Sequence, residues 1–426
     1  MENKKIIQVD EKVPFSVGIP LSLQHMFAMF GASVFVPMMF HINPSVVLLM
    51  NGIGTLIFIL ITKGKAPAYL GSSFAFLMPA GAVISKLGYS YALGGFIAVG
   101  LGLCILSAII YKFGVKWIDV VLPAAAMGPV VALIGLELAN SAASVGLIVP
   151  TKDVPVVQTS NVIVFLVTIS VAVLGSVLFR KFFAIIPILI SIVAGYITAY
   201  FTHVIKWADI KAALVTGFFT VPNFQTPRFD ITAMITIFPV ILVLASEHVG
   251  HQLVTGKIVG RDLIKDPGLH RSLFADGIST MFSGFVGSVP TTTYGENIGV
   301  MAITKVYSVR VIGGAAIISI LASFIGPVSA LIQTIPGPVM GGISFLLYGM
   351  IAASGIRVMV DAQVNFSKSR NLTLTSIVFL TGLSGVVIPI GEVEFKGMVL
   401  ACIVGMLLSL LFWAFDKLNL LNDKEQ

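Results

Sequence analysis

Long apolar runs joined by short polar connections dominate the chain between residues 15 and 413. A helix needs about 20 apolar residues to cross the hydrocarbon core of a bilayer, and most of these runs reach that length. The pattern predicts fourteen membrane segments and one long loop, 205–231, whose aromatic residues are typical of a membrane–water interface. The segments are 15–39, 44–62, 68–85, 90–111, 120–147, 161–179, 183–204, 232–256, 270–287, 290–304, 309–332, 336–356, 371–389 and 396–413.

Composition narrows the class of protein. Of the 426 residues, 57% are hydrophobic and 11% are charged, and the mean hydropathy is +1.01. Soluble domains carry about 25% charged residues. These values exclude a soluble enzyme, a disordered chain and a nucleic-acid binder, and they predict an all-α polytopic membrane protein.

The distribution of basic residues predicts the orientation. Lys and Arg number 26 against 19 Asp and Glu. If both termini and every second loop are cytoplasmic, 20 basic residues lie on that side and 6 on the other, as the positive-inside rule expects. The bias also favours an even number of segments. The first apolar run after the polar N-terminus is long and lacks a small-x-small cleavage site, so we expect no cleaved signal peptide.

Three pairs of similar stretches suggest an internal repeat, although shared membrane composition is the alternative explanation. The pairs are Pro20–Gly31 with Pro239–Gly250 and Gly94–Gly95 with Gly313–Gly314, both 219 residues apart, and Leu122–Gly128 with Ile335–Gly341, 213 apart. A repeat of seven segments inverts the second half relative to the first. Inverted repeats are typical of secondary transporters, which bind substrate between the halves.

Segments three and ten differ from the others. Residues 68–85 and 290–304 both begin with Tyr, Gly, Ser or Thr and only then become helix-like. We expect a short extended stretch followed by a half-helix in each, with Ser73–Ala75 matching Thr292–Tyr294. Interrupted segments at matching places are a strong pointer to a transporter site. Their unpaired backbone N–H groups would be free for a ligand.

Ionisable side chains inside the membrane are costly and are functional by default. The candidates are Glu137, Glu247, Glu296, His25, His248 and His251. Glu247 and His251 are one turn apart on one helical face, whereas His248 lies about 100° away and is expected to point elsewhere. Glu296 coincides with an interrupted segment, so Glu247 and Glu296 are the main site candidates. Glu137 is expected to have a structural role.

Gln24, His25 and Phe74 give weaker evidence of a role in or near the site. Gln24 and His25 form a polar pair among small residues, which fits structural support near the site. Phe74 beside Ser72 and Ser73 places an aromatic face in a polar, extended setting, where it could stack on a flat ring. Such stacking is worth about 1–3 kcal/mol per base.

No catalytic or metal-binding motif fits. The order Glu-His-x-x-His at 247–251 differs from both zinc-protease orders. The two cysteines, Cys104 and Cys402, lie in apolar runs, and no phosphate-binding loop occurs. We therefore expect no enzyme activity, no metal and no cofactor.

The chain contains the stretches PLSLQHMFAMFGASVFVP, AYLGSSFAF, EHVGH, DPGLHRS and TTTYGENIGVMAIT. Together they resemble the nucleobase–ascorbate transporters, also named nucleobase:cation symporters, and most closely their bacterial uracil-permease branch. The family signature appears as Glu296-Asn297-Ile298-Gly299 followed by Thr304-Lys305, with Lys305 where many members have Arg.

The resemblance implies two inverted sets of seven segments, with short strands in segments three and ten. A core domain would comprise 1–112 and 232–333, and a gate domain 113–231 and 334–415, followed by a cytoplasmic tail, 416–426. It also implies a homodimer formed through the gate domain, in the bacterial cytoplasmic (inner) membrane.

The resemblance also implies residue roles. Glu247 and Glu296 would accept the ring N–H groups of uracil, and backbone N–H groups at Phe74 and Gly295 would donate to its carbonyls. Phe74 and Tyr294 would line the ring, and His251 would couple a proton, together with Glu247. Gln24, His25, Ser73, Asn297 and Tyr348 would support the site.

The resulting expectation is proton-coupled import of uracil. A purine or xanthine permease of the same family is the nearest alternative, although Glu296 stands where xanthine and urate carriers more often have Gln. An anion exchanger or channel of the same fold is a further alternative, which two carboxylates in the site disfavour. We expect uracil, a proton and membrane lipid as partners, and no nucleic acid.

Overall fold

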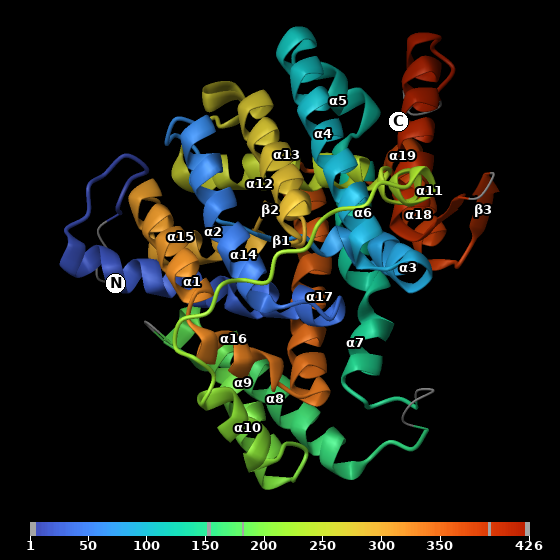
Figure 1. The fold of residues 1–426 in the computed structure, drawn as a ribbon. Helices are drawn as coiled ribbons and strands as arrows, with labels where there is room; N and C mark the ends of the chain where they lie inside the picture. The colour runs from blue at the N-terminus through green and yellow to red at the C-terminus, as the bar shows by residue number, and fades with distance from the viewer. Residues whose placement is uncertain (1–5, 151–154, 181–182, 391–392, 422–426) are drawn as a thin grey trace.

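The computed structural model describes residues 6–150, 155–180, 183–390 and 393–421, and these residues are mostly helical (Figure 1). Within them, seven helices are long and apolar enough to cross a membrane. They span Pro44–Ile61, Tyr89–Phe113, Ala124–Val145, Thr159–Leu178, Ile231–Val259, Gly337–Asp361 and Gly397–Lys417. The basic residues Lys4, Lys5, Lys152, Lys181 and Lys424, and the end of the predicted tail, lie outside the described residues.

The first half of the chain contains one strand and ten α-helices within the described residues. They are α1 (Phe15–Met39), α2 (Pro44–Ile61), β1 (Leu70–Ser72), the 3₁₀ turn η1 (Phe74–Phe76), α3 (Leu77–Leu87), α4 (Tyr89–Phe113), α5 (Lys116–Val121), α6 (Ala124–Glu137), α7 (Ala139–Val145), α8 (Thr159–Leu178), the 3₁₀ turn η2 (Phe183–Ile185), α9 (Pro187–Phe201) and α10 (Trp207–Leu214).

The second half contains three strands and nine α-helices within the described residues. They are α11 (Ile231–Ile237), α12 (Val240–Val259), the turn η3 (Ile264–Gly268), α13 (Leu269–Val286), β2 (Thr291–Thr293), α14 (Gly295–Thr304), α15 (Val309–Ser323), α16 (Gly326–Gln333), α17 (Gly337–Asp361), α18 (Ser369–Leu383), β3 (Val387–Ile390), β4 (Val393–Lys396) and α19 (Gly397–Lys417).

Strands β1 and β2 meet near the centre of the molecule, where they pair antiparallel (Figure 1). Leu70 pairs with Thr293 and Ser72 with Thr291. Both interrupted segments therefore have the expected strand followed by a helix. Because Leu70 and Thr291 are 221 positions apart, the elements match at an offset of 221 rather than 219. By its place in its element, Phe74 corresponds to Gly295 and not to Thr293.

Helices from the two halves pack closely around this centre. Helix α4 packs against α13, α2 against α15, and α6 against α17, while α8 lies against α9 and α18 against α19. A Cβ at Gly100 of α4 would collide with the backbone of Gly277 and Met281 in α13. Glycine thus permits a backbone approach that any larger residue would block, as is common between membrane helices.

Several predicted segments are interrupted. Segment 120–147 lies across α5, α6 and α7, and segment 232–256 breaks between α11 and α12 at Pro239, because proline has no N–H for the helix ladder. Segment 309–332 breaks at Phe324 and Ile325. There the carbonyl of Phe324 accepts from Thr220 N–H at 3.0 Å, so the long loop is bridged to the break.

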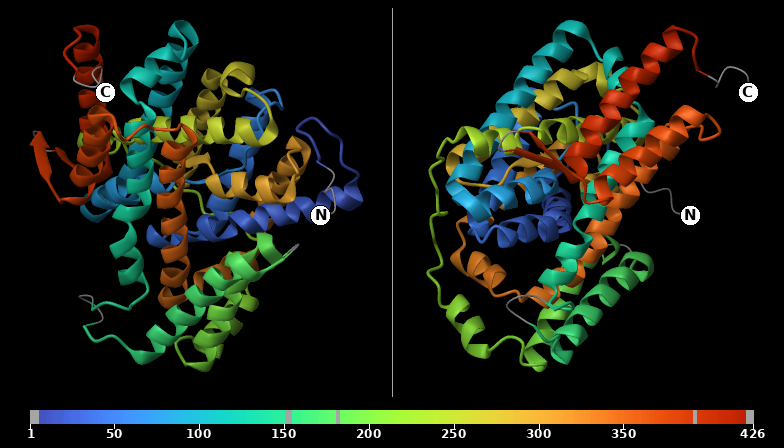
Figure 2. Two further views of the ribbon diagram at one scale, coloured as in Figure 1. Left: turned by 180° about the vertical axis from the view of Figure 1, so that it is seen from behind. Right: turned by 90° about the vertical axis from the view of Figure 1, so that its right-hand side faces the viewer.

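Two further predictions are wrong in detail. The loop 205–231 contains the short helix α10. Segment 371–389 ends as a helix at Leu383, and β3 and β4 then form an antiparallel hairpin at one side of the molecule (Figure 2). The apolar run concealed the change from helix to strand, because a short apolar stretch has no periodicity that separates the two.

Candidate functional site

Two helix N-termini converge on one cavity at the ends of the paired strands. The turn η1 begins at Phe74, with one residue between it and the end of β1, and α14 begins at Gly295, with one residue between it and the end of β2. The first N–H groups of a helix have no intrahelical partner. The cavity has a volume of about 360 Å³ and is lined by Phe74, Glu247, His251, Tyr294, Gly295 and Glu296. Its opposite wall comes from the start of α9 and the middle of α17.

Helix α12 contributes Glu247 and His251, both of which line the cavity. His251 Nδ1 shares a hydrogen bond of 3.1 Å with Thr293 Oγ1 of β2. The Nε2 atom of His251 faces the start of α14, since a Cβ at Gly295 would lie 3.3 Å from it. The histidine is therefore fixed by the strand and turned toward the cavity, rather than bonded to Glu247.

Glu296 lies in the first turn of α14, where the helix dipole favours a carboxylate. Its Oε1 atom is buried and has no hydrogen-bond partner among the described residues. An unpaired buried carboxylate oxygen is costly, so a donor from a ligand would be strongly favoured there.

Phe74, which lines the cavity, belongs to a cluster of three aromatic rings. The Phe74 ring stacks on Phe35 with centroids 6.2 Å apart and meets Tyr348 edge-on at 5.8 Å. Tyr348 also contacts Phe35 edge-on at 5.6 Å. Tyr348 thus packs against Phe74 instead of lining the cavity. Sequence reasoning missed Phe35, because a phenylalanine in a membrane helix has no signal that separates a site role from packing.

Tyr294 connects the two interrupted segments. Its hydroxyl donates to the carbonyl of Ser72 at 2.8 Å. Its ring lies over Gly71, where any Cβ would collide with the ring. Glycine at position 71 is therefore required for this contact between segments far apart in sequence.

The predicted supporting residues occupy different positions. His25 Nδ1 lies 2.9 Å from Asn297 Oδ1, directly after Glu296. Gln24 is buried in α1 and does not line the cavity. Ser73 is buried beside Phe74, and its hydroxyl has no partner among the described residues.

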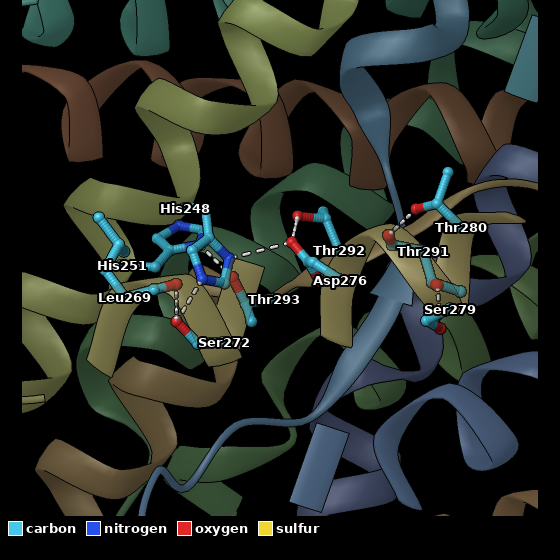
Figure 3. Close-up of polar contacts among 10 residues, drawn as sticks. All are labelled: His248, His251, Leu269, Ser272, Asp276, Ser279, Thr280, Thr291, Thr292 and Thr293. Atoms are coloured by element: carbon cyan, nitrogen blue, oxygen red, sulfur yellow. Dashed lines mark hydrogen bonds and ion pairs between the residues drawn. The ribbon is translucent and has the colours of Figure 1, made fainter. Parts of the chain in front are cut away.

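A buried network of hydrogen bonds links β2 to helices α12 and α13 (Figure 3). His248 bonds Asp276 Oδ2 at 3.0 Å and Ser272 Oγ at 2.9 Å. The same Asp276 oxygen accepts from Thr292 Oγ1 at 3.1 Å. Sequence reasoning placed His248 away from the site but missed Asp276. An acidic residue inside the predicted segment 270–287 was the available signal.

Comparison with known proteins decides the family. The profile of the permease family matches residues 18–391. The chain belongs to the permease family. Family membership makes this permease a multi-pass membrane transporter rather than an enzyme.

Curated relatives resemble the permease over almost its whole length. It is 54% identical to the uracil permease of Escherichia coli strain K12 over 409 residues, which cover 96% of this chain and 94% of that one. It is 51% identical to the uracil permease of Paenibacillus larvae over 426 residues, covering 98% and 99%. Identity to the uracil permease of Bacillus subtilis is 42% over 411 residues, covering 94% of each chain.

Solved structures share the fold of the permease. Murine Solute Carrier 26 family member A9, an anion transporter, superposes with a TM-score of 0.70 at 12% identity, covering 95% of this chain and 69% of that one. The transmembrane domain of the cyanobacterial bicarbonate transporter BicA gives 0.63 at 13% identity, covering 94% and 100%. At such low identity these likenesses show the fold alone.

Glu137, the third of the carboxylates singled out from the sequence, does not line the cavity. Its Oε2 accepts the backbone N–H of Met398 at 3.0 Å and so caps the start of α19. Among the described residues no group of three or more His, Cys, Asp or Glu side chains could hold a metal ion.

Proposed function

We propose that the permease imports uracil across the bacterial cytoplasmic membrane by proton symport, and that the cavity between η1, α12 and α14 binds the substrate. The observation that carries this proposal is the unpaired, buried Oε1 of Glu296 in a cavity that also contains Glu247 and Phe74. The uracil permeases that resemble this chain over nearly its full length support the choice of substrate.

Uracil alternates donors and acceptors around its edge, and the cavity has the opposite pattern. The carboxylates of Glu247 and Glu296 accept the two ring N–H groups, while backbone N–H groups at Phe74 and Gly295 donate to the carbonyls. Phe74 and Tyr294 border the flat ring. A ring with the reversed order would leave buried polar groups unpaired, which is how such a site rejects analogues.

Proton coupling is assigned to His251 together with Glu247. His251 touches both the anchored strand β2 and the space beside Gly295. A proton on this ring would therefore change the charge next to the substrate.

The proposed architecture is fourteen segments in two inverted sets of seven, with both termini cytoplasmic. Residues 1–112 and 232–333 form a core domain, 113–231 and 334–415 form a gate domain, and 416–426 form a tail. Packing of α4 on α13 and of α6 on α17 supports this division, since each pair unites helices of one proposed domain. The cavity lies where the two groups meet, and the gate domain would form the homodimer.

The test is radiolabelled uptake into proteoliposomes, with proton and sodium gradients imposed separately. We expect an inward proton gradient alone to accelerate uracil accumulation, with no response to sodium. Unlabelled uracil should compete at far lower concentration than xanthine. Stronger accumulation of xanthine than of uracil would identify xanthine as the substrate. Acceleration of uptake by a sodium gradient alone would identify sodium as the coupling ion.

A further inference from the structure

A second cavity lies beside the beginning of α1 and shares no lining residue with the proposed uracil-binding cavity. It has a volume of about 810 Å³ and runs between the beginning of α1 and α15. We name it the α1–α15 groove, and its lining residues are Lys12, Val13, Pro14, Phe15, Gly18, Ile19, Ser22, Arg310, Val311, Gly314, Ile317 and Ile318. Apart from Lys12, Arg310 and Ser22, the lining is apolar.

Backbone pairing brings the two cations of this groove to the same end. Ile7 N–H donates to Lys305 O at 2.9 Å, and Val309 N–H donates to Val9 O at 3.1 Å. The segment before α1 therefore runs along the segment before α15. Lys12 and Arg310 each follow this paired stretch by one to three residues, so both charges enter the groove from the same side.

The acidic residues next to this end of the groove are Asp10 and Glu11, and neither lines it. The Glu11 carboxylate accepts Gln8 N–H at 3.1 Å. Lys12 and Arg310 are exposed, and the charged group of neither forms an ion pair or hydrogen bond with the residues that the structure describes. The nearby Asp10 bonds instead to Arg261 at 2.6 Å, and that hydrogen bond lowers the pKa of its carboxyl group. Within the part of the chain that the structure describes, no Asp or Glu lines the groove.

The rest of the groove is shaped for an apolar chain. The Phe15, Ile19 and Ile317 side chains are 86%, 53% and 52% exposed, so they face whatever surrounds the protein. Gly18 leaves space between them, because a Cβ there would meet nothing closer than 3.9 Å. In a membrane protein the surrounding medium is lipid, which makes an acyl chain the natural occupant.

We propose that the α1–α15 groove binds one phospholipid with an anionic headgroup. Its phosphate lies between Lys12 and Arg310, and one acyl chain follows Ile19, Ile317 and Ile318. Basic pockets between membrane helices are known to select anionic headgroups, whose attraction to each nearby Lys or Arg is substantial. The two unpaired cations bind the phosphate, and the apolar hollow beside them binds the acyl chain.

The test is native mass spectrometry of the purified full chain titrated with dioleoylphosphatidylglycerol or dioleoylphosphatidylcholine, which differ only in the headgroup. We expect about tenfold tighter binding of the phosphatidylglycerol. The double variant Lys12→Gln/Arg310→Gln should abolish this preference. The matched double variant Lys63→Gln/Lys116→Gln removes two exposed cations outside the groove and should keep it.

Filling the hollow tests the acyl-chain half of the proposal. Gly18→Leu has space for its side chain and improves helix propensity, so folding should survive, which a thermal unfolding scan checks. It should weaken binding of both lipids by a similar factor.

Four outcomes of the lipid-binding measurements would overturn the proposal. They are equal binding of the two lipids, equal loss in the control double variant, unchanged binding in Gly18→Leu, and displacement of phosphatidylglycerol by inorganic phosphate alone. A dimer that Gly18→Leu dissociates would also overturn it, by assigning the groove to a second copy of the chain.

Discussion

The two interrupted segments have the same plan but hold their strands in different ways. In the first, the hydroxyls of Ser72 in β1 and of Ser73 after it have no partner among the described residues. Within that part of the chain, side-chain hydrogen bonds hold β1 only through its backbone, where Leu70 N–H donates to Thr55 Oγ1 at 2.9 Å and the Ser72 carbonyl accepts from the Tyr294 hydroxyl at 2.8 Å. In the second, every residue of β2 has a bonded side chain. Thr291 bonds to Ser279, Thr292 bonds to Asp276 and Thr293 bonds to His251.

The side chain that lines the cavity after each strand also differs between the two segments. After β1 the cavity receives the aromatic ring of Phe74, and after β2 it receives the carboxylate of Glu296. A charged group needs a fixed position to select a ligand, because a buried charge without its partner is costly. The comparison teaches that the more firmly anchored segment is the one that carries the charge.

The largest expected effect comes from removing that charge. Glu296→Gln turns part of an acceptor into a donor that faces the ring N–H of uracil, and Glu247→Gln does the same on α12. We expect each to weaken uracil binding on the order of 100-fold, measured by isothermal titration calorimetry. Glu137→Gln is the matched control, since this carboxylate caps α19 outside the cavity. Near-normal affinity in either site variant would remove that residue from the substrate contacts.

His251→Ala should separate binding from coupling. Because His251 contacts Thr293 and faces Gly295, we expect loss of proton-driven accumulation with a smaller loss of affinity. Paired measurements of uracil affinity and of uptake with and without a proton gradient check this. His248→Ala, in the buried network outside the cavity, should lower thermal stability while the gradient still accelerates uptake. If His251→Ala retains the wild-type acceleration, the carboxylates carry the proton alone.

A smaller effect should follow a change in the first segment. Gly71→Ala introduces a Cβ that collides with the Tyr294 ring, so it should shift this tyrosine and weaken uracil binding by roughly tenfold. Gly81→Ala in α3 meets nothing within 4 Å and should leave affinity unchanged. Equal affinities in the two variants would show that the contact between Tyr294 and Gly71 does not position the site.

The smallest effect tests the anchoring difference itself. Thr292→Val removes the hydrogen bond to Asp276 with little change of shape and should cost about 1 kcal/mol of stability. Ser72→Ala removes a hydroxyl with no partner among the described residues and should cost less or nothing. Thermal unfolding in detergent measures both. A larger loss in Ser72→Ala would contradict the view that β2 is the more firmly held strand.

Much of the site could be predicted from the sequence, because membrane burial makes polar residues conspicuous. Glu247, Glu296 and His251 stood out as ionisable groups in apolar runs, and the Gly- and Thr-rich starts of 68–85 and 290–304 predicted strand followed by helix. Asp276 carried the same signal and was missed. Phe35 and Gly71 carried none, since their importance depends on rings contributed by distant segments.

The sequence by itself determined that the chain is a helical membrane protein with two interrupted segments, because apolar length and the cost of buried polar groups are local properties. Only the tertiary structure decided which residues meet. It paired β1 antiparallel with β2, turned His251 toward Thr293 instead of Glu247, broke segment 309–332 where the loop bridges Phe324, and converted the end of 371–389 into a hairpin. Each of these depends on a partner far away in the chain, and pairing between distant residues leaves no trace in the periodicity of either one.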